Sequence, residues 1–315
     1  MPPPELLARF GPLSVVLARP GVTDVLVTPG PSGPEVWADS GPGLVRVPVP
    51  MGGDSSVRRL AVNLLAEGGR ALDDAHPAGD ARLPGDIRVH AVLPPLSRDG
   101  VALSIRVPRP EPLSLEDWGL SGDVAARLRG AVLGRRNLLI AGGTGTGKTT
   151  LVASLLREVP ASERIVLIED VAELSIDHPH VVHLESRSAN PEGLGAWTLS
   201  DLLRESLRMR PDRLVVGECR GAELSVMLTA LNTGHDGSAT TLHAGTLAGV
   251  PARLEALGAL SGLSPEALAG QAVAAIHLVV FLRRDASGRR RVEALGELVN
   301  GPAGIAIRAT WAETQ

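Results

Sequence analysis

Hydrophobic and polar residues follow different patterns in the two halves of the chain. From Ser121 onward, short apolar runs are separated by helix-like stretches, which is the pattern of a parallel α/β sheet. The last apolar run is expected to pair with residues 291–299 across residues 285–288, as a closing hairpin. The apolar runs predict strands at residues 137–140, 165–168, 181–184, 213–216, 239–242 and 276–282.

The first 107 residues carry shorter runs between Pro and Gly clusters, which predict a small α+β domain. Residues 54–67 are expected to form a helix, because apolar residues from Val57 to Leu65 fall on one helical face. Two strands at residues 87–93 and 101–107 should pair across the intervening loop. Further strands are predicted at residues 24–28, 35–38 and 44–49.

Prolines at positions 108, 110 and 112 separate these two patterns. Proline at this density is typical of a stiff, extended linker. We therefore predict an amino-terminal α+β domain at residues 1–107, a proline-rich linker at 108–120 and an α/β domain at 121–315.

The composition narrows the class of protein. A net charge of −4, with two Phe, four Trp and no Tyr, disfavours direct nucleic-acid binding. The single cysteine, Cys219, permits neither an internal disulfide nor a cysteine-based zinc site. We expect no signal peptide, because the first 20 residues lack an unbroken apolar stretch. We also expect no transmembrane segment, because the longest apolar stretch, residues 272–282, is too short to span a bilayer.

The chain contains 31 Lys and Arg residues, and only Lys148 is a lysine. It lies in a run that fits G-x-x-x-x-G-K-[ST], the phosphate-binding P-loop, between a predicted strand and a predicted helix. Backbone amides of such a loop surround the β-phosphate, Lys148 reaches the β and γ oxygens, and the Thr149 hydroxyl ligates Mg²⁺. The sequence therefore predicts ATP and Mg²⁺ bound by Gly142, Gly143, Thr144, Gly145, Thr146, Gly147, Lys148, Thr149 and Thr150.

Acidic residues follow two of the predicted strands. Glu218 comes after the strand at 213–216, where it can reach Mg²⁺ or an attacking water, although Gly217 stands where an Asp is usual. Glu169 and Asp170 end the strand at 165–168, and Glu173 follows. Two acidic strand ends beside one P-loop indicate hydrolysis, and a solvated surface charge is the alternative for Glu173 and Glu169.

His243 follows the predicted strand at 239–242 and should therefore emerge at the same sheet edge. It is either a sensor of the γ-phosphate or a structural residue with satisfied hydrogen bonds, and the residues by themselves favour neither role.

Together, these segments resemble the secretion ATPases of type II and type IV systems (VirB11-like), and within them the TadA/CpaF branch that drives Flp (tight-adherence) pili. The resemblance is carried by Asp80–Pro84 with Arg88–His90, by Gly142–Thr150, by Ile165–Leu174, by Leu207–Glu218 and by Gly234–His243.

The resemblance implies a PAS-like amino-terminal domain, a linker and a RecA-like P-loop NTPase domain. It also implies a homo-hexamer at the cytoplasmic face of the inner membrane, bound to platform proteins of a pilus or secretion apparatus. The chain departs from the family in lacking a long helical amino-terminal extension, and from the type II secretion and pilus extension branches in lacking zinc-binding cysteines.

The same resemblance implies roles for individual residues. Glu218 becomes the Walker B glutamate and His243 the His box, whereas Glu169, Asp170 and Glu173 form the Asp box. Arg88 and Arg106 resemble the arginines that the first domain directs toward the γ-phosphate. The expected catalytic residues are Lys148, Glu218, Glu169, His243, Arg88 and Arg106, with Thr149, Glu218 and Asp170 around Mg²⁺.

Three other functions remain open at this point. A DNA-translocating ATPase of conjugal transfer would share the P-loop, and DNA-stimulated hydrolysis would reveal it. A small-molecule kinase would need an acceptor, and a nucleotide-gated binding module would show negligible turnover.

Overall fold

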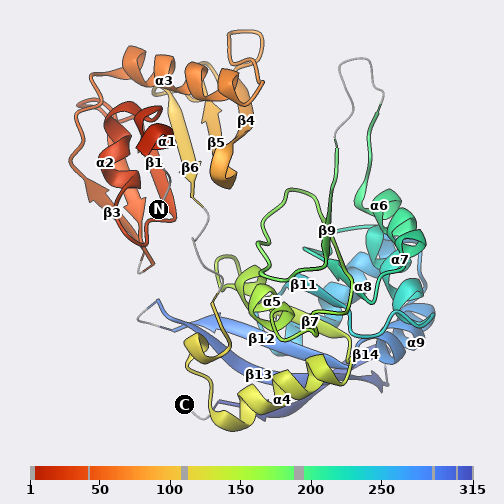
Figure 1. The fold of residues 1–315 in the computed structure, drawn as a ribbon. Helices are drawn as coiled ribbons and strands as arrows, with labels where there is room; N and C mark the ends of the chain where they lie inside the picture. Colours follow the sequence, from red (N-terminus) through yellow and green to blue (C-terminus); the bar gives the residue numbers. More distant parts are fainter. Residues whose placement is uncertain are drawn as a thin grey trace. The chain divides into compact units, whose positions relative to one another are not determined.

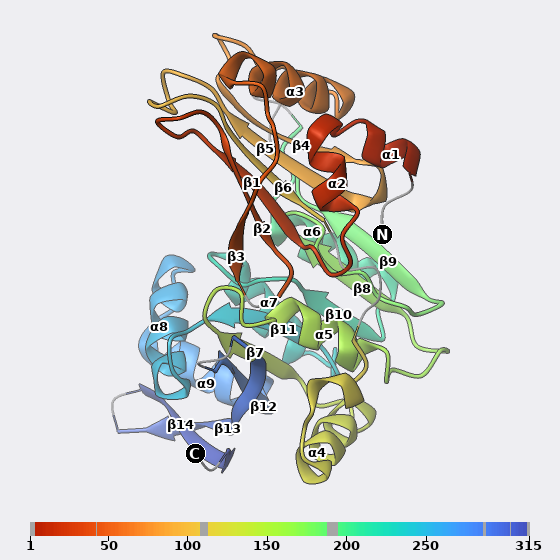
Figure 2. The ribbon, with the colours of Figure 1, turned by 90° about the vertical axis from the view of Figure 1, so that its left-hand side faces the viewer.

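The computed structural model describes residues 4–41, 43–107, 113–187, 195–285, 288–302 and 304–313. The chain divides into two compact units. Unit 1 comprises residues 1–111 with 286–289, and unit 2 comprises residues 112–285 with 290–315. Both units are drawn in Figures 1 and 2.

Unit 1 is built on a six-stranded antiparallel sheet in the order β3-β2-β1-β6-β5-β4. One face of the sheet packs on the helices, because alternate strand residues such as Val25 and Ile105 share a core with Phe10 and Leu64. The elements are α1 (Pro4–Ala8), α2 (Ser14–Leu17), β1 (Asp24–Thr28), β2 (Glu35–Asp39), β3 (Leu44–Val47), α3 (Asp54–Glu67), β4 (Ala78–Leu83), β5 (Ile87–Val92) and β6 (Ala102–Arg106).

The predicted helix at 54–67 and the antiparallel pairing of β5 with β6 are confirmed. Sequence reasoning missed α1, α2 and β4. Strand β4 is hard to recognise because it carries Gly79, Asp80 and Arg82, and only Ala81 and Leu83 of its residues are buried.

Unit 2 has an eight-stranded sheet in the order β14-β13-β12-β7-β11-β10-β8-β9. Its strands are parallel from β12 to β9, and β12, β13 and β14 form an antiparallel extension. The strands are β7 (Leu138–Gly142), β8 (Ile165–Glu169), β9 (Val181–Glu185), β10 (Arg213–Val216), β11 (Ala239–His243), β12 (Leu278–Arg284), β13 (Arg290–Gly301) and β14 (Gly304–Ala312).

Helices cover both faces of this sheet, so the central strands are buried on both sides (Figure 1). Helices α4 and α5 enclose one core, and α6 to α9 enclose the other. Their bounds are α4 (Gly122–Leu133), α5 (Lys148–Leu156), α6 (Leu199–Ser206), α7 (Glu223–Leu231), α8 (Val250–Leu260) and α9 (Pro265–Ala275). None of the helices in the described ranges combines the length and apolarity needed to cross a bilayer.

The predicted α/β sheet and its closing hairpin are confirmed, and two details differ. Strand β14 was not predicted, and it pairs antiparallel with β13 to extend the hairpin. The predicted linker is wrong for residues 113–120, since Leu115 and Trp118 are buried in unit 2 and the Trp118 indole donates to Ser154 Oγ at 2.9 Å. Residues 108–112 lie outside the described ranges.

Candidate active site

The P-loop joins β7 to α5, as the motif requires. Glycine is needed at two points of this loop for different reasons. A Cβ on Gly142 would lie 2.6 Å from the carbonyl oxygen of Leu282, on the neighbouring strand β12. Gly147, directly before α5, has φ of 93°, a conformation that other residues adopt only with strain. The resulting loop ends at a helix amino terminus, a suitable site for phosphate.

Lys148 is held inside this loop and only 7% of its surface is exposed. Its Nζ donates to the carbonyl oxygens of Gly142, at 3.1 Å, and Gly143, at 3.0 Å. Both ring nitrogens of His243 lie 3.4 Å from Nζ. Burial lowers the pKa of Lys148, while the carboxylates of Glu218 and Glu173 act in the opposite direction. The ammonium is thus positioned at the loop that would receive the phosphates.

Glu218 follows β10 and lies beside His243, as the strand-end interpretation predicts. Its Oε1 is 3.1 Å from His243 Nε2, and its Oε2 is 2.6 Å from Arg220 Nη2. Burial acts to raise the pKa of Glu218, but the Arg220 hydrogen bond and the nearby positive charges outweigh it, so the pKa is lowered. Glu218 is therefore a carboxylate at neutral pH.

His243 links Lys148 to Glu218 at the end of β11. Burial and the Lys148 charge lower the pKa of His243, although Glu218 opposes this shift. The imidazole is therefore mainly neutral at pH 7. Strand order explains the contact, because β11 lies between β7, which leads into the P-loop, and β10.

Glu169 ends β8 and is 4% exposed. Its Oε1 accepts hydrogen bonds from the backbone N–H groups of Glu173, at 2.8 Å, and Leu174, at 3.0 Å. A Cβ on Gly217 would lie 2.8 Å from Glu169 Cγ. Glu169 therefore fills the space that a side chain at position 217 would use, and it also fixes the loop that carries Asp170 and Glu173.

Asp170 and Glu173 lie close enough to Arg220 for their charges to help raise its pKa, after the larger effect of Glu218. The predicted Asp box thus gathers beside Glu218. No group of three or more His, Cys, Asp or Glu side chains suited to a metal occurs in the described residues. Mg²⁺ is commonly held by one or two carboxylates together with substrate phosphates and water. Thr149 would supply a hydroxyl and Glu218 a carboxylate.

Arg88 and Arg106 are cross-strand neighbours in unit 1. In the antiparallel register, Arg88 pairs with Arg82 on one side and with Arg106 on the other. Arg106 Nε lies 3.8 Å from a carboxylate oxygen of Asp24 on β1. Carboxylates lie beside this row of arginines, since Arg82 also pairs with Asp86 at 3.1 Å.

Sequence reasoning missed three arginines around the P-loop region of unit 2. Arg284 Nε donates to the Gly145 carbonyl at 2.8 Å, and Arg290 Nη1 lies 3.5 Å from Thr150 Oγ1. Arg284 ends β12 and Arg290 begins β13, and the end of β12 lies near the P-loop because β12 pairs with β7. Arg220 could have been found, since it lies two residues after Glu218 and side chains two apart in an extended segment share a side.

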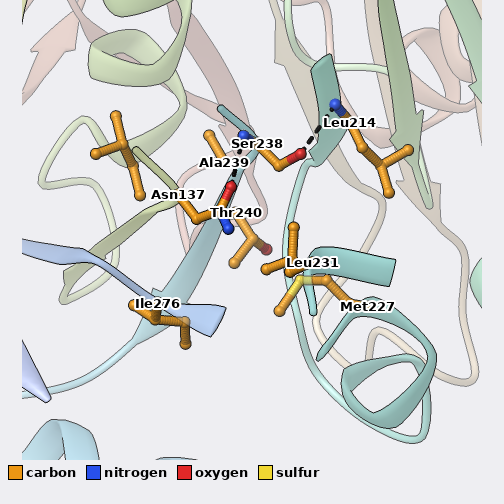
Figure 3. A pocket seen from close by; sticks show the side chains of 9 residues that line it. Asn137, Leu214, Met227, Leu231, Ser238, Ala239, Thr240 and Ile276 are labelled. Atoms are coloured by element: carbon orange, nitrogen blue, oxygen red, sulfur yellow. Dashed lines mark hydrogen bonds between the residues drawn. The ribbon is translucent and has the colours of Figure 1, made fainter. Parts of the chain in front are cut away.

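A small cavity lies at the opposite edge of the same sheet, between β7, β10, β11 and the ends of α7 and α9 (Figure 3). Ser238 N donates to Asn137 Oδ1 at 3.0 Å, and Leu214 N donates to Ser238 Oγ at 3.1 Å. Arg213 Nη1 donates to the Gly237 carbonyl at 3.3 Å. The Gly234–Ser238 part of the family-like segment therefore has a structural role, distant from the P-loop edge.

The family described as "Type II/IV secretion system protein" matches residues 53–300, and the chain belongs to that family. A protein of Mycobacterium tuberculosis named "Putative conjugal transfer protein Rv3659c" is 46% identical over 315 aligned residues, covering 97% of this chain and 89% of its own length. The VirB11 type IV secretion protein of Brucella suis is 35% identical over 204 residues, with 56% of each chain covered.

Solved structures agree with this membership. The Brucella suis VirB11 ATPase is 27% identical with a TM-score of 0.50, covering 92% of this chain and 96% of that one. The pilus retraction motor PilT, solved with ADP, has a TM-score of 0.58 at 19% identity, covering 93% and 80% of the two chains, and this likeness concerns the fold alone. With the P-loop geometry, membership makes this chain a secretion-system ATPase of the VirB11 type.

Proposed function

We propose that the chain is an ATP-hydrolysing motor that works as a homo-hexamer on a pilus or secretion apparatus. The observation that carries the proposal is the contact chain from Lys148 through His243 to Glu218, which joins the P-loop to a carboxylate at the end of a central strand. A lysine at the phosphates and a residue that positions water are two of the groups by which P-loop enzymes transfer a phosphoryl group to water.

Each residue of the site has a separate task in this proposal. Lys148 neutralises charge on the β- and γ-phosphate oxygens. Glu218 is ionised and orients the attacking water, accepting a hydrogen bond from it. The neutral His243 can report on the γ-phosphate because it contacts both Lys148 and Glu218. Thr149, Glu218 and Asp170 would hold Mg²⁺, and the ion would neutralise part of the phosphate charge.

Arg88 and Arg106 supply further positive charge to the γ-phosphate in the proposed ring, where a single Lys148 is too little. Their direct pairing across β5 and β6 supports this role, since both guanidinium groups start from one sheet face. Unit 1 would then be the PAS-like domain that couples nucleotide state to movement. An arginine acting in this way is worth roughly 10³ to 10⁵ in rate in other P-loop enzymes.

We assign the motor to the TadA/CpaF branch that assembles Flp or type IV-like pili, at the cytoplasmic face of the inner membrane and on platform proteins there. Two observations support this assignment. The motif set from Asp80 to His243 resembles that branch, and Cys219 is the single cysteine, so the zinc-binding cysteines of other branches are missing. A platform protein of the inner membrane should therefore raise the hydrolysis rate.

Conjugal transfer is the second candidate function, favoured by the names of relatives. These include the Mycobacterium tuberculosis protein and "Conjugal transfer protein TrbB" of Rhizobium radiobacter, which is 34% identical over 227 residues, covering 69% of this chain and 67% of TrbB. The net charge of −4 and the few aromatic residues count against direct DNA handling. ATP hydrolysis stimulated by DNA, with a steep salt dependence, would favour this candidate.

The test of the proposed motor combines turnover with assembly state. Phosphate release from ATP and the mass of the particle are measured on the same sample, with and without nucleotide. We expect hydrolysis that depends on Lys148 and Glu218, and a six-subunit particle. Full activity in a monomer would refute the ring, and the absence of hydrolysis in every assembly state would refute the motor.

A further inference from the structure

Arg220 lies beside Glu218 because of the local backbone. In the segment after β10 the exposure of side chains alternates: Cys219 is buried, whereas Glu218 and Arg220 are more exposed. Arg220 Nη2 therefore reaches Glu218 Oε2 at 2.6 Å, the length of a strong charge-assisted hydrogen bond.

Hydrogen bonds to β8, to β11 and to Glu223 fix the backbone of residues 217–221. Gly217 N donates to the Ile168 carbonyl of β8 at 2.8 Å, and Cys219 N donates to the Thr241 carbonyl of β11 at 3.0 Å. Gly221 N donates to Glu223 Oε1 at 2.7 Å, and Arg220 N bonds the same oxygen. Since Glu223 is buried at the start of α7, the Arg220 main chain has little freedom.

The two oxygens of Glu218 have different partners. Oε2 accepts from Arg220, and Oε1 contacts His243 at 3.1 Å. A glutamate has three rotatable side-chain bonds, and two partners on opposite oxygens restrict all of them. Removing the guanidinium would leave His243 alone to orient the carboxylate, beside the negative charges of Asp170 and Glu173.

We propose that Arg220 is a positioning residue, which holds the Glu218 carboxylate in the orientation needed to direct the attacking water. This role rests on the proposed ATP hydrolysis. Arg220 acts through Glu218 and does not itself touch the nucleotide, so its loss should affect turnover far more than nucleotide affinity.

The test compares kcat with KM and nucleotide affinity. For Arg220→Ala, we expect kcat to fall at least tenfold, because a carboxylate that directs water contributes about 10² or more and would be only partly misplaced. KM for ATP and the Kd of a fluorescent ADP analogue should change less than about threefold. Arg220→Lys should recover part of the lost rate, since it restores the charge without the planar fork.

A double-mutant cycle then shows whether the effect passes through Glu218. In a Glu218→Gln background, Arg220→Ala should cost little more, because the partner that it positions is already impaired. Arg308→Ala is the matched control: Arg308 on β14 is an exposed arginine whose Nη2 likewise donates to a glutamate, Glu297 Oε2, at 2.9 Å. This control should retain the wild-type rate.

Three results would overturn the inference. These are a wild-type kcat for Arg220→Ala, an undiminished loss in the Glu218→Gln background, or a loss confined to nucleotide affinity. If Arg220→Ala does not fold by circular dichroism, the same measurements on Arg220→Lys decide, with a wild-type kcat and additive behaviour counting against the role. Failure of the proposed function can be told apart from failure of this inference, because the wild type would then show no Lys148-dependent hydrolysis.

Discussion

Buried or partly buried polar side chains lie at both edges of the unit 2 sheet, but their bonding partners differ. At the amino-terminal edge, Asn137, Ser238 and Arg213 hydrogen-bond to backbone groups of neighbouring segments. At the carboxyl edge, His243 contacts the side chains of both Lys148 and Glu218, and Lys148 also donates to two carbonyls of its own loop.

This difference suggests a structural role for the polar residues at one edge and a chemical role for those at the other. A buried polar group that bonds distant backbone holds elements together, and its loss leaves unpaired groups inside the protein. A side chain that contacts other side chains at the end of a parallel strand can exchange its partners for a ligand. We therefore expect changes at the carboxyl edge to remove activity and changes at the amino-terminal edge to remove stability.

The largest effect should follow the loss of Lys148. Lys148→Ala, and also Lys148→Arg, should reduce ATP hydrolysis about a thousandfold or more, because a compact charge at the transferred phosphate is lost and a planar guanidinium does not fit in its place. Phosphate release measures the rate, and thermal melting should show a folded protein. Unchanged turnover in either variant would refute the P-loop assignment.

Arg213 lies at the opposite edge, where we expect a substitution to lower stability and leave activity unchanged. It is 1% exposed and paired with Glu163, and its guanidinium also bonds the Val132 carbonyl at 2.9 Å. Arg213→Ala should lower the free energy of unfolding by about 3 kcal/mol, since it leaves buried partners unpaired. Urea denaturation measures the loss, and kcat per folded molecule should stay near wild type. A stable variant with lost turnover would break the proposed division between the edges.

Glu218→Gln tests the role of the carboxylate at the carboxyl edge, because the amide has nearly the same size and shape. The variant should bind ATP normally and hydrolyse it at least about a hundredfold more slowly, because a water-positioning carboxylate is removed while the phosphate loop is untouched. Glu169→Gln is the matched comparison, since Glu169 bonds loop amides. If Glu169→Gln is fully active while Glu218→Gln is inactive, Glu169 has a structural role only.

Ser238→Ala should produce the smallest effect. Its hydroxyl donates to the His235 carbonyl at 2.7 Å and accepts from Leu214 N at 3.1 Å. Loss of these buried bonds should cost about 1 to 2 kcal/mol of stability. Denaturant titration and ATPase assays on one preparation check both halves of the prediction. A tenfold fall in kcat without a loss of stability would contradict it.

Much of the fold could be predicted from local patterns. The helix at Asp54–Glu67 and the strand at Arg213–Val216 follow from helical periodicity and from an apolar β-type run. Strand β4 could not be recognised in this way, because Gly79, Asp80 and Arg82 mask its alternation. Residues 113–120 were misjudged because nearby prolines indicated a linker, whereas burial of Leu115 and Trp118 outweighs that local preference.

The sequence by itself determined the P-loop, its single lysine and the strand ends that carry Glu218, Glu169 and His243, because these features depend on residues adjacent in the chain. The tertiary structure decided which of them meet. The order β7-β11-β10-β8 places His243 between Lys148 and Glu218, and it places Glu169 beside Gly217. His243 is 95 positions from Lys148, so their contact depends on the pairing of strands and not on neighbouring residues.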